Sequence, residues 1–277
     1  MLRFRRLWTS RTLLADQSEN DNNRKAESQE SIHEETDEEY EKNIKIKILN
    51  ASLQFVPDMG WSKQAISAGA ESIGYPGVIH GLFPNGSAAL VFYFYSMCNR
   101  DLNQILEKEA LAIEANPSNP RKTPEQHVCD AVETRLRMVV PYKKTWPQAM
   151  AIMSLQPNVL TALANLLTLV DDICYYAGDK SVDINWYTRR MILAGTYKAT
   201  ELYMLQDSSE DHKETWLFLE RRIKDIFQVQ TMLSSSIKPD ETLNRVTETA
   251  TAVFITVRLF PIDYIVDKMA RNILGLN

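Results

Sequence analysis

The chain has 277 residues, enough for one large or two small hydrophobic cores, and a formal net charge of −5. From residue 42 onward the acids and bases balance, with 25 of each, so the negative excess belongs to the N-terminal segments. A balanced body lacks the positive charge on which binding to nucleic-acid phosphates depends. The composition therefore argues against a nucleic-acid-binding protein and against strong electrostatic steering of a partner.

The first fourteen residues, MLRFRRLWTSRTLL, contain four arginines and no acid. Apolar residues are interspersed with the arginines, which is typical of a mitochondrial presequence, whereas a secretory signal has a longer unbroken apolar core. We therefore predict a mitochondrial transit peptide over residues 1–15 and a location in the matrix. A disordered basic tail is the alternative that the composition leaves open.

Residues 16–41 have the opposite composition, with eleven acids, two bases and almost no aliphatic side chain. Such a segment cannot bury enough apolar surface to offset the conformational entropy lost on folding. We interpret it as a disordered acidic linker that precedes a folded domain over residues 42–230.

Three short helical segments follow the linker in helix-turn-helix order. Residues 48–56 supply a first helix, which residues 57–60 are expected to break, and Ser62 can cap a second helix. The glycine- and proline-rich turn at 74–77 then leads into residues 78–83, where a recognition helix would lie. In its spacing this module resembles the tetracycline-repressor-type DNA-binding domain.

The chemistry of this module differs from that of a DNA-binding domain. No lysine or arginine occurs between Lys63 and Arg100, although such a domain makes several contacts from these side chains to phosphates. We therefore expect a helix-turn-helix fold without DNA binding. Three amphipathic core helices of unrelated ancestry are the alternative, and a ligand-responsive transcription regulator is the competing function.

The rest of the chain predicts a single all-α domain, because its apolar residues recur at helical spacing and strand signals are missing. A long helix carries an apolar stripe from Leu90 to Leu106 and is expected to end before Pro117. Further helices are predicted at 123–139, 145–155, 158–176, 182–206 and 211–229.

Familiar motifs of catalysis and metal binding are missing from the sequence. A di-iron carboxylate bundle needs an E-x-x-H turn on each of two core helices, and the only such turn here joins Glu30 to His33 in the acidic linker. The chain has no nucleophile elbow, phosphate-binding glycine loop or H-E-x-x-H motif. His127 and Cys129 would point to different sides of a helix. We predict no catalytic centre, no metal site and no cofactor; an unfamiliar site built from scattered acids is the alternative.

A second informative block, DDICYYAGDKSVDINWYTRR, covers residues 171–190. Gly178 can stop one helix and a polar residue shortly after it can cap the next, so two helices meet at an acidic corner. Trp186 and Arg190 lie one helical turn apart, and tryptophan and arginine dominate the energetics of protein interfaces. We predict a partner-binding surface here. The alternative is a core tryptophan with an arginine that pairs with a nearby acid.

Several ungapped strings in this part of the chain resemble one family. They are ETRLRMVVPY at 133–142, the pair Trp146-Pro147, VDD at 170–172, YAGD at 176–179, DINWYTRR at 183–190, ATEL at 199–202 and MLQDSS at 204–209. These strings are similar to the mitochondrial accessory proteins of ubiquinone biosynthesis that are numbered nine in the coenzyme Q series. The similarity runs from about residue 44 to residue 220.

The resemblance implies a non-catalytic, homodimeric lipid-binding protein with a tetracycline-repressor-like fold. It implies that the bound ligand is a lipid or isoprenoid quinone precursor. The implied partners are the di-iron demethoxyubiquinone hydroxylase, the ubiquinone biosynthesis complex and the matrix side of the inner membrane, to which the protein would bind peripherally. The family's hydroxylase-docking surface maps here onto Asp171, Ile173, Asp183, Trp186, Tyr187 and Arg190. Ile173 stands where a methionine is expected, which is a conservative change.

The ligand would be held between helices and handed to the hydroxylase at the Trp186 surface. Each methylene group gains about 0.8 kcal/mol on leaving water, so a protein cavity competes with a bilayer only by offering comparable apolar area. Our candidate lining residues are Leu155, Leu160, Leu163, Leu167 and Tyr197. Such a stripe is more often part of an ordinary core, and the pattern does not distinguish the two.

Beyond residue 220 the match weakens, and the tail is interpreted from its own pattern. Apolar residues at helical spacing predict an amphipathic helix that contains Leu243, Val246, Val253, Phe254 and Val257. Pro261 interrupts this stripe, and a second one follows over 262–273; charges break both well before the roughly 20 apolar residues of a membrane span. We predict a membrane-associating tail over 240–277. Which helix contacts lipid is left open, as is the alternative that both pack on the protein.

Overall fold

The computed structural model describes the backbone of residues 38–115, 122–178 and 184–236, and the side chains of these ranges except those of 184–188 and 229–236. These ranges contain helices, turns and loops and no strand, which confirms the predicted all-α class. The predicted transit peptide and the predicted membrane-associating tail lie outside the described residues. The first described helix covers residues 38–52, so the last residues of the predicted linker are helical.

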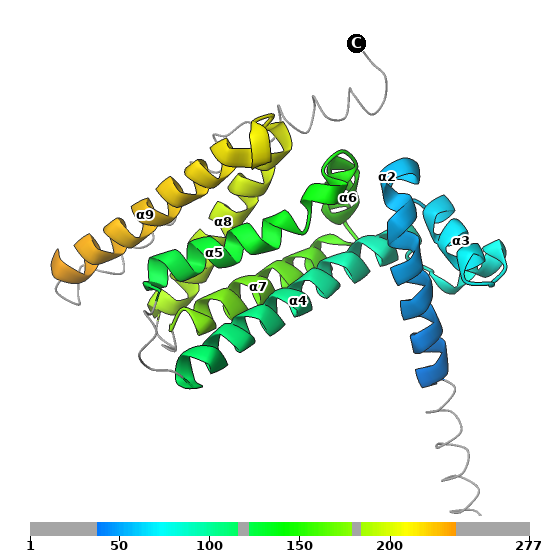
Figure 1. The fold of residues 1–277 in the computed structure, drawn as a ribbon, viewed down its shortest axis with the longest axis horizontal. Coiled ribbons are helices and arrows are strands. Elements are labelled where there is room, and N and C mark those ends of the chain that lie inside the picture. The colour runs from blue at the N-terminus through cyan, green and yellow to red at the C-terminus, as the bar shows by residue number, and fades with distance from the viewer. Residues whose placement is uncertain (1–37, 116–121, 179–183, 237–277) are drawn as a thin grey trace, which may run out of the picture.

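The N-terminal module lies at one end of the molecule (blue and cyan in Figure 1). Its helix 38–52 leads through the 3-10 turn Leu53–Phe55 and α2 (Val56–Met59) to α3 (Lys63–Ser72). The predicted cap is confirmed, because the Ser62 hydroxyl accepts a hydrogen bond from the Ala65 amide at 3.1 Å. Helix 38–52 and α3 approach closely at Gly69, where a Cβ atom would stand 2.6 Å from the Cα of Ser52. Glycine is therefore the residue that this packing requires.

Two details of the helix-turn-helix prediction are wrong. The chain was predicted to leave the helix from residue 57, but Pro57 occupies the first turn of α2. The helical path ends only at Gly60, whose φ is +66°. The predicted recognition segment is a 3-10 helix, Gly77–Leu82, because its two glycines favour a longer α-helix poorly. The ring of His80 is held locally, with Nδ1 2.9 Å from the Gly77 carbonyl oxygen and 3.3 Å from the Ser67 hydroxyl.

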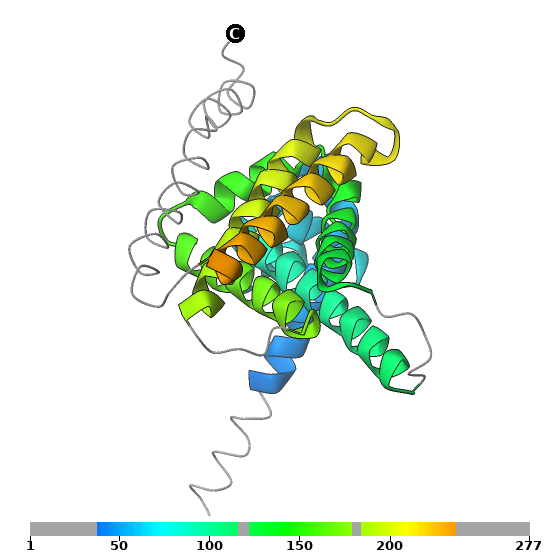
Figure 2. The same cartoon turned by 90° about the vertical axis from the view of Figure 1, so that its left-hand side faces the viewer.

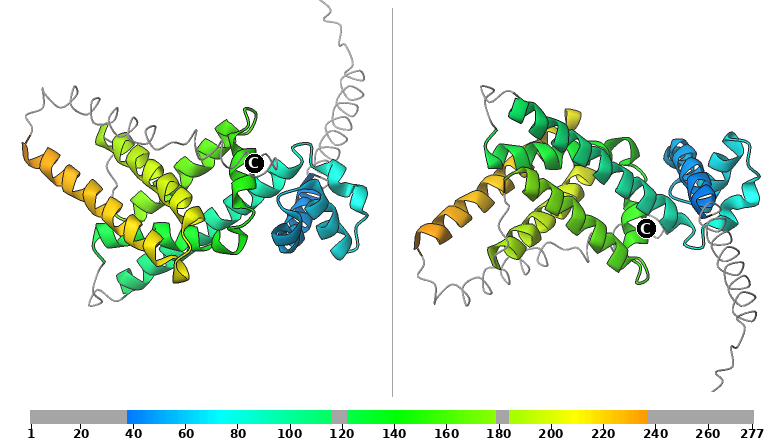
Figure 3. Two further views of the ribbon diagram at one scale, coloured as in Figure 1. Left: turned by 90° about the horizontal axis from the view of Figure 1, so that it is seen from above. Right: turned by 90° about the horizontal axis from the view of Figure 1, so that it is seen from below.

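The helical body follows the predicted order, and its boundaries agree with the predicted ones within two residues, except that the last helix continues to Ser236 and not to residue 229. Its elements are α4 (Ser87–Ala115), α5 (Pro124–Arg137), a 3-10 turn (Val140–Tyr142), α6 (Trp146–Ser154), α7 (Val159–Tyr176), α8 (Ile184–Gln206), a 3-10 turn (Glu210–His212) and α9 (Lys213–Ser236). Helix α4 packs on α7 and α6, α5 packs on α9, and α8 packs on both α7 and α9. Figure 2 faces the end at which α9 stops, and Figure 3 shows α9 and the N-terminal module at opposite ends of the molecule.

Four aromatic rings join the N-terminal module to the body. Trp61 packs against Phe94 of α4 at 5.3 Å between ring centroids, and against Tyr142 and Trp146 at 5.6 Å each. The backbone of Trp61 also exchanges hydrogen bonds with the side-chain amide of Gln148, at 2.9 and 3.3 Å. Tilted and edge-on aromatic pairs contribute beyond their buried area, so this cluster fixes where the module sits.

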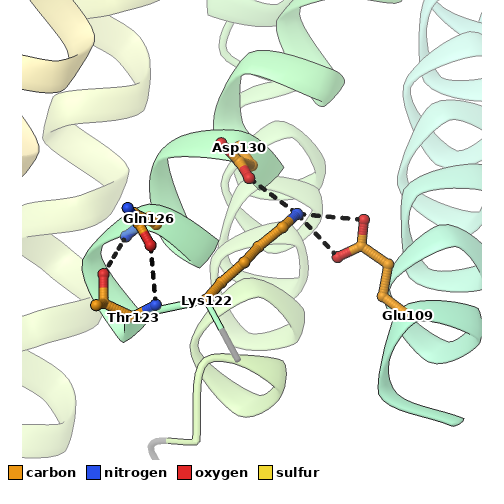
Figure 4. A network of polar contacts seen from close by, with 5 residues as sticks. All are labelled: Glu109, Lys122, Thr123, Gln126 and Asp130. Carbon is orange, nitrogen blue, oxygen red and sulfur yellow. Dashed lines mark hydrogen bonds and ion pairs between the residues drawn. The ribbon is translucent and has the colours of Figure 1, made fainter. Parts of the chain in front are cut away.

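The start of α5 is set by a capping box (Figure 4). The Thr123 hydroxyl accepts from the Gln126 amide at 3.2 Å, and the Gln126 side chain accepts from the Thr123 amide at 3.1 Å. Beside it, Lys122 connects the end of α4 to α5 through Glu109 at 3.3 Å and Asp130 at 2.8 Å. These ion pairs are exposed and therefore contribute little to stability.

Hydrogen bonds and an ion pair also hold the connection between α8 and α9. The carboxylate of Asp207 accepts hydrogen bonds from the amides of Ser209 and Thr215, at 2.8 and 2.9 Å, and from the Thr215 hydroxyl at 2.6 Å. Burial alone would raise the pKa of Asp207, but these donors lower it well below its usual range. Asp211, whose φ is +52°, is held by a two-pronged ion pair with Arg137 at 2.8 and 3.0 Å.

Candidate functional site

The outward face of α7 carries large apolar side chains in contact with solvent. Leu160, Leu163 and Leu167 are 77%, 44% and 37% exposed. They lie three and four residues apart and therefore share one face of the helix. Leu155, which precedes the helix, is also exposed. The alternative that these four predicted lipid-lining residues are ordinary core does not hold, and we call this set the α7 leucine face.

The opposite face of α7 is ordinary core. Leu166, Leu169 and Val170 are buried there against α4 and α8. Among the described residues, α7 is also the one helix long and apolar enough to cross a membrane by length and composition, and 28% of it is buried. An apolar helix of the core would be covered on most of its surface, whereas the α7 leucine face is an exposed apolar patch among the described residues.

The fifth residue predicted to contact lipid lies elsewhere. Tyr197 of α8 is completely buried in the interior, whereas the α7 leucine face points to solvent. The structure therefore does not bring Tyr197 together with the leucines. Residues Leu243, Val246, Val253, Phe254 and Val257 lie outside the described residues.

At the end of α7, the predicted partner-binding corner is held by an ion pair. The Arg190 Nε atom of α8 lies 2.7 Å from Oδ1 of Asp171, and the arginine is buried while the carboxylate is exposed. One part of the alternative interpretation is therefore correct, because Arg190 pairs with a nearby acid. Of the two groups in this ion pair, the Asp171 carboxylate is the one that stays exposed.

The other residues predicted to bind the partner differ in what the structure describes of them. Ile173 is fully buried in the core under this corner, so its side chain supports the surface and does not form part of it. Trp186 and Tyr187 lie on the first turns of α8, Ile184–Gln206, but their side chains are outside the described ones. Asp183 lies outside the described residues.

The interior of the body contains a polar cluster that the sequence pattern did not predict. It consists of Tyr95 from α4, Arg135 from α5 and Tyr197, Lys198 and Glu201 from α8, and we call it the Arg135 cluster. Arg135, Tyr197 and Glu201 are completely buried and Tyr95 is 1% exposed. The cluster has a sequence signal, since Arg135 falls on the stripe of Val128, Ala131 and Val132, the buried face of α5.

A groove of about 610 Å³ runs between α5 and α9. Its lining includes four acids, Glu125, Asp130, Glu133 and Glu220, together with Lys213 and apolar residues such as Trp216. Cys129 also lies in the groove, and burial together with the surrounding acids raises the pKa of its thiol to about 11. Burial raises the pKa of Cys98 to about 11 as well. Both thiols are therefore protonated at neutral pH and are poor nucleophiles.

Within the ranges that the structure describes, no group of three or more histidine, cysteine, aspartate or glutamate side chains is placed to hold a metal ion. The arrangement offers an exposed apolar face, an ion-paired corner at its end and a buried cationic cluster. Of these features, the exposed apolar face is the one with a surface suited to contact with an apolar molecule.

Two family models match the chain. The model described as "COQ9" matches residues 159–230, and the model "Ubiquinone biosynthesis protein COQ9, N-terminal domain" matches residues 41–71. The first match contains the α7 leucine face, except for Leu155, and the corner between α7 and α8.

Similar proteins carry the same designation. The chain is 47% identical over 84% of its length to "Ubiquinone biosynthesis protein COQ9, mitochondrial" of Drosophila melanogaster, and 45% identical over 69% of its length to the Homo sapiens protein of that name. It is 37% identical over 67% of its length to "Probable ubiquinone biosynthesis protein coq9, mitochondrial" of Dictyostelium discoideum. The matches span 65% of the fly protein, 60% of the human protein and 60% of the Dictyostelium protein.

Proposed function

Because this chain belongs to the COQ9 family of mitochondrial ubiquinone biosynthesis proteins, we propose that it is a non-catalytic lipid-binding subunit of that pathway. It binds isoprenoid quinone precursors and presents them to the di-iron demethoxyubiquinone hydroxylase. The observation that carries the proposal is the α7 leucine face, an exposed apolar surface on a helix that ends at an ion-paired corner.

One helix connects the two halves of this function. Leu160 and Asp171 lie eleven residues apart on α7, a distance of about 16 Å along the helix axis. A prenyl chain laid along the leucines would therefore place its head group near the corner where the hydroxylase docks. Each methylene group shielded from water contributes about 0.8 kcal/mol, so the α7 leucine face competes with a bilayer only for the part of the prenyl chain that it shields to a comparable extent.

The remaining parts of the proposal concern location and assembly. The basic, acid-free leader supports import into mitochondria, and the relatives are named as mitochondrial proteins. The protein acts as a homodimer on the matrix side of the inner membrane, to which residues 240–277 attach it peripherally. Two described thiols with raised pKa values fit a binding role better than a nucleophilic one.

The proposal is tested by mass spectrometry of lipids that co-purify with the protein. The double substitution Leu160→Ser with Leu163→Ser is expected to remove most of the bound isoprenoid lipid while the helix content stays unchanged. Leu111→Ser with Leu217→Ser is the matched control, since these leucines are 58% and 41% exposed on α4 and α9. Equal lipid in both double variants would contradict a binding role for the α7 leucine face.

A further inference from the structure

The Arg135 cluster contains two cations and one carboxylate. The carboxylate of Glu201 is already occupied, because Oε2 lies 2.7 Å from Nζ of Lys198 and Oε1 accepts a hydrogen bond from the Trp146 indole at 3.0 Å. Arg135 touches no carboxylate among the described residues. Glu201 is also among the neighbours that raise the pKa of Arg135, so the two cations share the charge of this one carboxylate.

The bonds that Arg135 makes are all to neutral groups. Its Nε donates to the Asn99 side-chain oxygen at 2.9 Å, its Nη2 donates to the Tyr95 carbonyl at 3.4 Å, and its guanidinium lies 4.6 Å from the centre of the Tyr95 ring. Burial alone would lower the pKa of Arg135, but the neighbouring tyrosines raise it on balance, so the charge persists.

One buried polar atom of the cluster, Nη1 of Arg135, is left without a hydrogen-bond partner within the described structure. The hydroxyl groups of Tyr95 and Tyr197 have no partner there other than each other, and Tyr197 acts on the pKa of Tyr95 as a hydrogen-bond partner. All three residues are at most 1% exposed, so solvent does not satisfy these atoms. Buried polar groups in native proteins are almost always paired, and a buried unpaired charge is costly. A guanidinium fork and two phenol hydroxyls are donors suited to a single negatively charged oxygen group.

We infer that the Arg135 cluster is an internal binding site for an oxyanion, a ligand that bears a carboxylate, phosphate or phenolate oxygen. The ligand's charge neutralises Arg135, and its oxygens accept hydrogen bonds from Nη1 and from the hydroxyls of Tyr95 and Tyr197. The oxyanion is either the head group of an acidic lipid or a free small anion. The lipid source rests on the function proposed above, whereas the free anion does not.

The position of the cluster connects it with the lipid-binding helix. Asn99, which accepts the hydrogen bond from Arg135, also donates through Nδ2 to the backbone carbonyl of Asn165 on α7, at 3.0 Å. Arg135 is thereby joined to α7 through one side chain. A charged head group at Arg135 would therefore change the hydrogen bonding of the same helix that carries the α7 leucine face.

The inference is tested with the full chain by titration calorimetry and thermal unfolding, using three probes. Inorganic phosphate represents the free anion, oleate represents a lipid with an oxyanion head group, and oleyl alcohol has the same chain with a neutral head group. We expect phosphate to raise the unfolding temperature, or oleate to raise it more than oleyl alcohol does, because binding of the apolar chain to the α7 leucine face is common to both lipids. An excess response to oleate alone identifies a lipid head group and a response to phosphate alone a small anion; no response to phosphate together with equal responses to oleate and oleyl alcohol overturns the inference.

The double variant Tyr95→Phe with Tyr197→Phe separates a ligand site from a structural cluster. It removes both hydroxyls of the tyrosine pair at nearly constant volume and leaves neither without its partner, so the ligand-free protein is expected to unfold at the same temperature or higher. Its affinity for the oxyanion is expected to fall about tenfold, the loss of roughly one hydrogen bond to a charged group. Unchanged affinity in this variant overturns the inference.

A second variant keeps the two proposals distinct. Leu160→Ser with Leu163→Ser removes the α7 leucine face and leaves the Arg135 cluster intact. If the proposed lipid function fails but the oxyanion site is real, phosphate binding persists in this variant and is weakened about tenfold in the double phenylalanine variant. If only the lipid function is real, oleate and oleyl alcohol bind equally to the wild type, and the leucine substitutions weaken both.

Discussion

The α7 leucine face and the Arg135 cluster reverse the usual distribution of residues in a protein. Three leucines of α7, at positions 160, 163 and 167, are 37–77% exposed, while in the interior an arginine and a glutamate are completely buried. Both arrangements cost free energy in an isolated folded chain, because apolar surface is left in water and charges are removed from it. In the function and the site that we propose, the first arrangement binds an apolar chain and the second a charged head group.

The N-terminal module shows that this reversal is local. Its apolar residues Ile48, Val56 and Ile66 are completely buried, and Ser62 and His80 make local hydrogen bonds. The module keeps a helix-turn-helix order without cationic residues between Lys63 and Arg100. The exposed leucines and the buried charges therefore both belong to the helical body. Substitutions in the body show most directly how each arrangement contributes to stability and binding.

The largest effect is expected at the buried carboxylate of the Arg135 cluster. Glu201→Ala leaves the Trp146 indole and Lys198 without their partner beside Arg135, and removing one member of a buried ion pair typically costs 3–5 kcal/mol. We expect about 3 kcal/mol, the lower end, because the Lys198 side chain is 32% exposed and can turn to solvent. Urea unfolding measures the loss. A loss below about 1 kcal/mol would show that the interior is hydrated and that the cluster is not a low-dielectric site.

The next effect concerns the corner at the end of α7. Trp186→Lys is expected to weaken binding to the hydroxylase by more than ~2 kcal/mol, the scale of an interface hot spot, while helix content and bound lipid stay near those of the wild type. Isothermal titration with the purified hydroxylase measures the change. Unfolding or loss of lipid with the partner contact intact would instead make Trp186 a core residue.

Asp207 provides a satisfied buried carboxylate to compare with the unsatisfied Arg135 cluster. Since its folded pKa is lowered, its contribution to stability is present above the unfolded value of about 3.9 and is lost as the pH falls through the folded value. Asp207→Asn should therefore lower the free energy of unfolding by about 1.5 kcal/mol at pH 7, because the hydrogen bonds to the charged carboxylate are lost in part. The gap between the two proteins should narrow below pH 4 in urea unfolding; a gap independent of pH would assign the loss to packing.

The order and bounds of the helices were predictable because local residues determine them. Ser62 caps α3, Thr123 and Gln126 cap α5, and Pro117 lies just beyond the last residue of α4. The 3-10 form of Gly77–Leu82 was less accessible, since apolar spacing over six residues does not distinguish it from an α-helix.

The candidate site was predictable only in part. The pattern of α7 is apolar on most sides, so spacing alone could not show that Leu160 faces solvent while Leu169 is buried. The partners of Arg135 lie on helices that are distant in sequence, such as Asn99 on α4, so no local sequence pattern predicts these contacts. Ile173 was assigned to a surface by resemblance, yet its side chain fills the core beneath it.

The smallest effect is expected on the α7 leucine face itself. Leu163→Ser should change the free energy of unfolding by no more than about 0.5 kcal/mol, as for other exposed positions. Leu169→Ser, on the buried side of the same helix, should cost at least about 2 kcal/mol because it leaves a cavity and buries a hydroxyl. Both variants are compared by urea unfolding at several protein concentrations. A loss above about 1.5 kcal/mol for Leu163→Ser that grows with protein concentration would mean that a second copy of the chain covers this face. In that case the exposed leucines belong to a dimer interface, and the lipid has to be held elsewhere in the body.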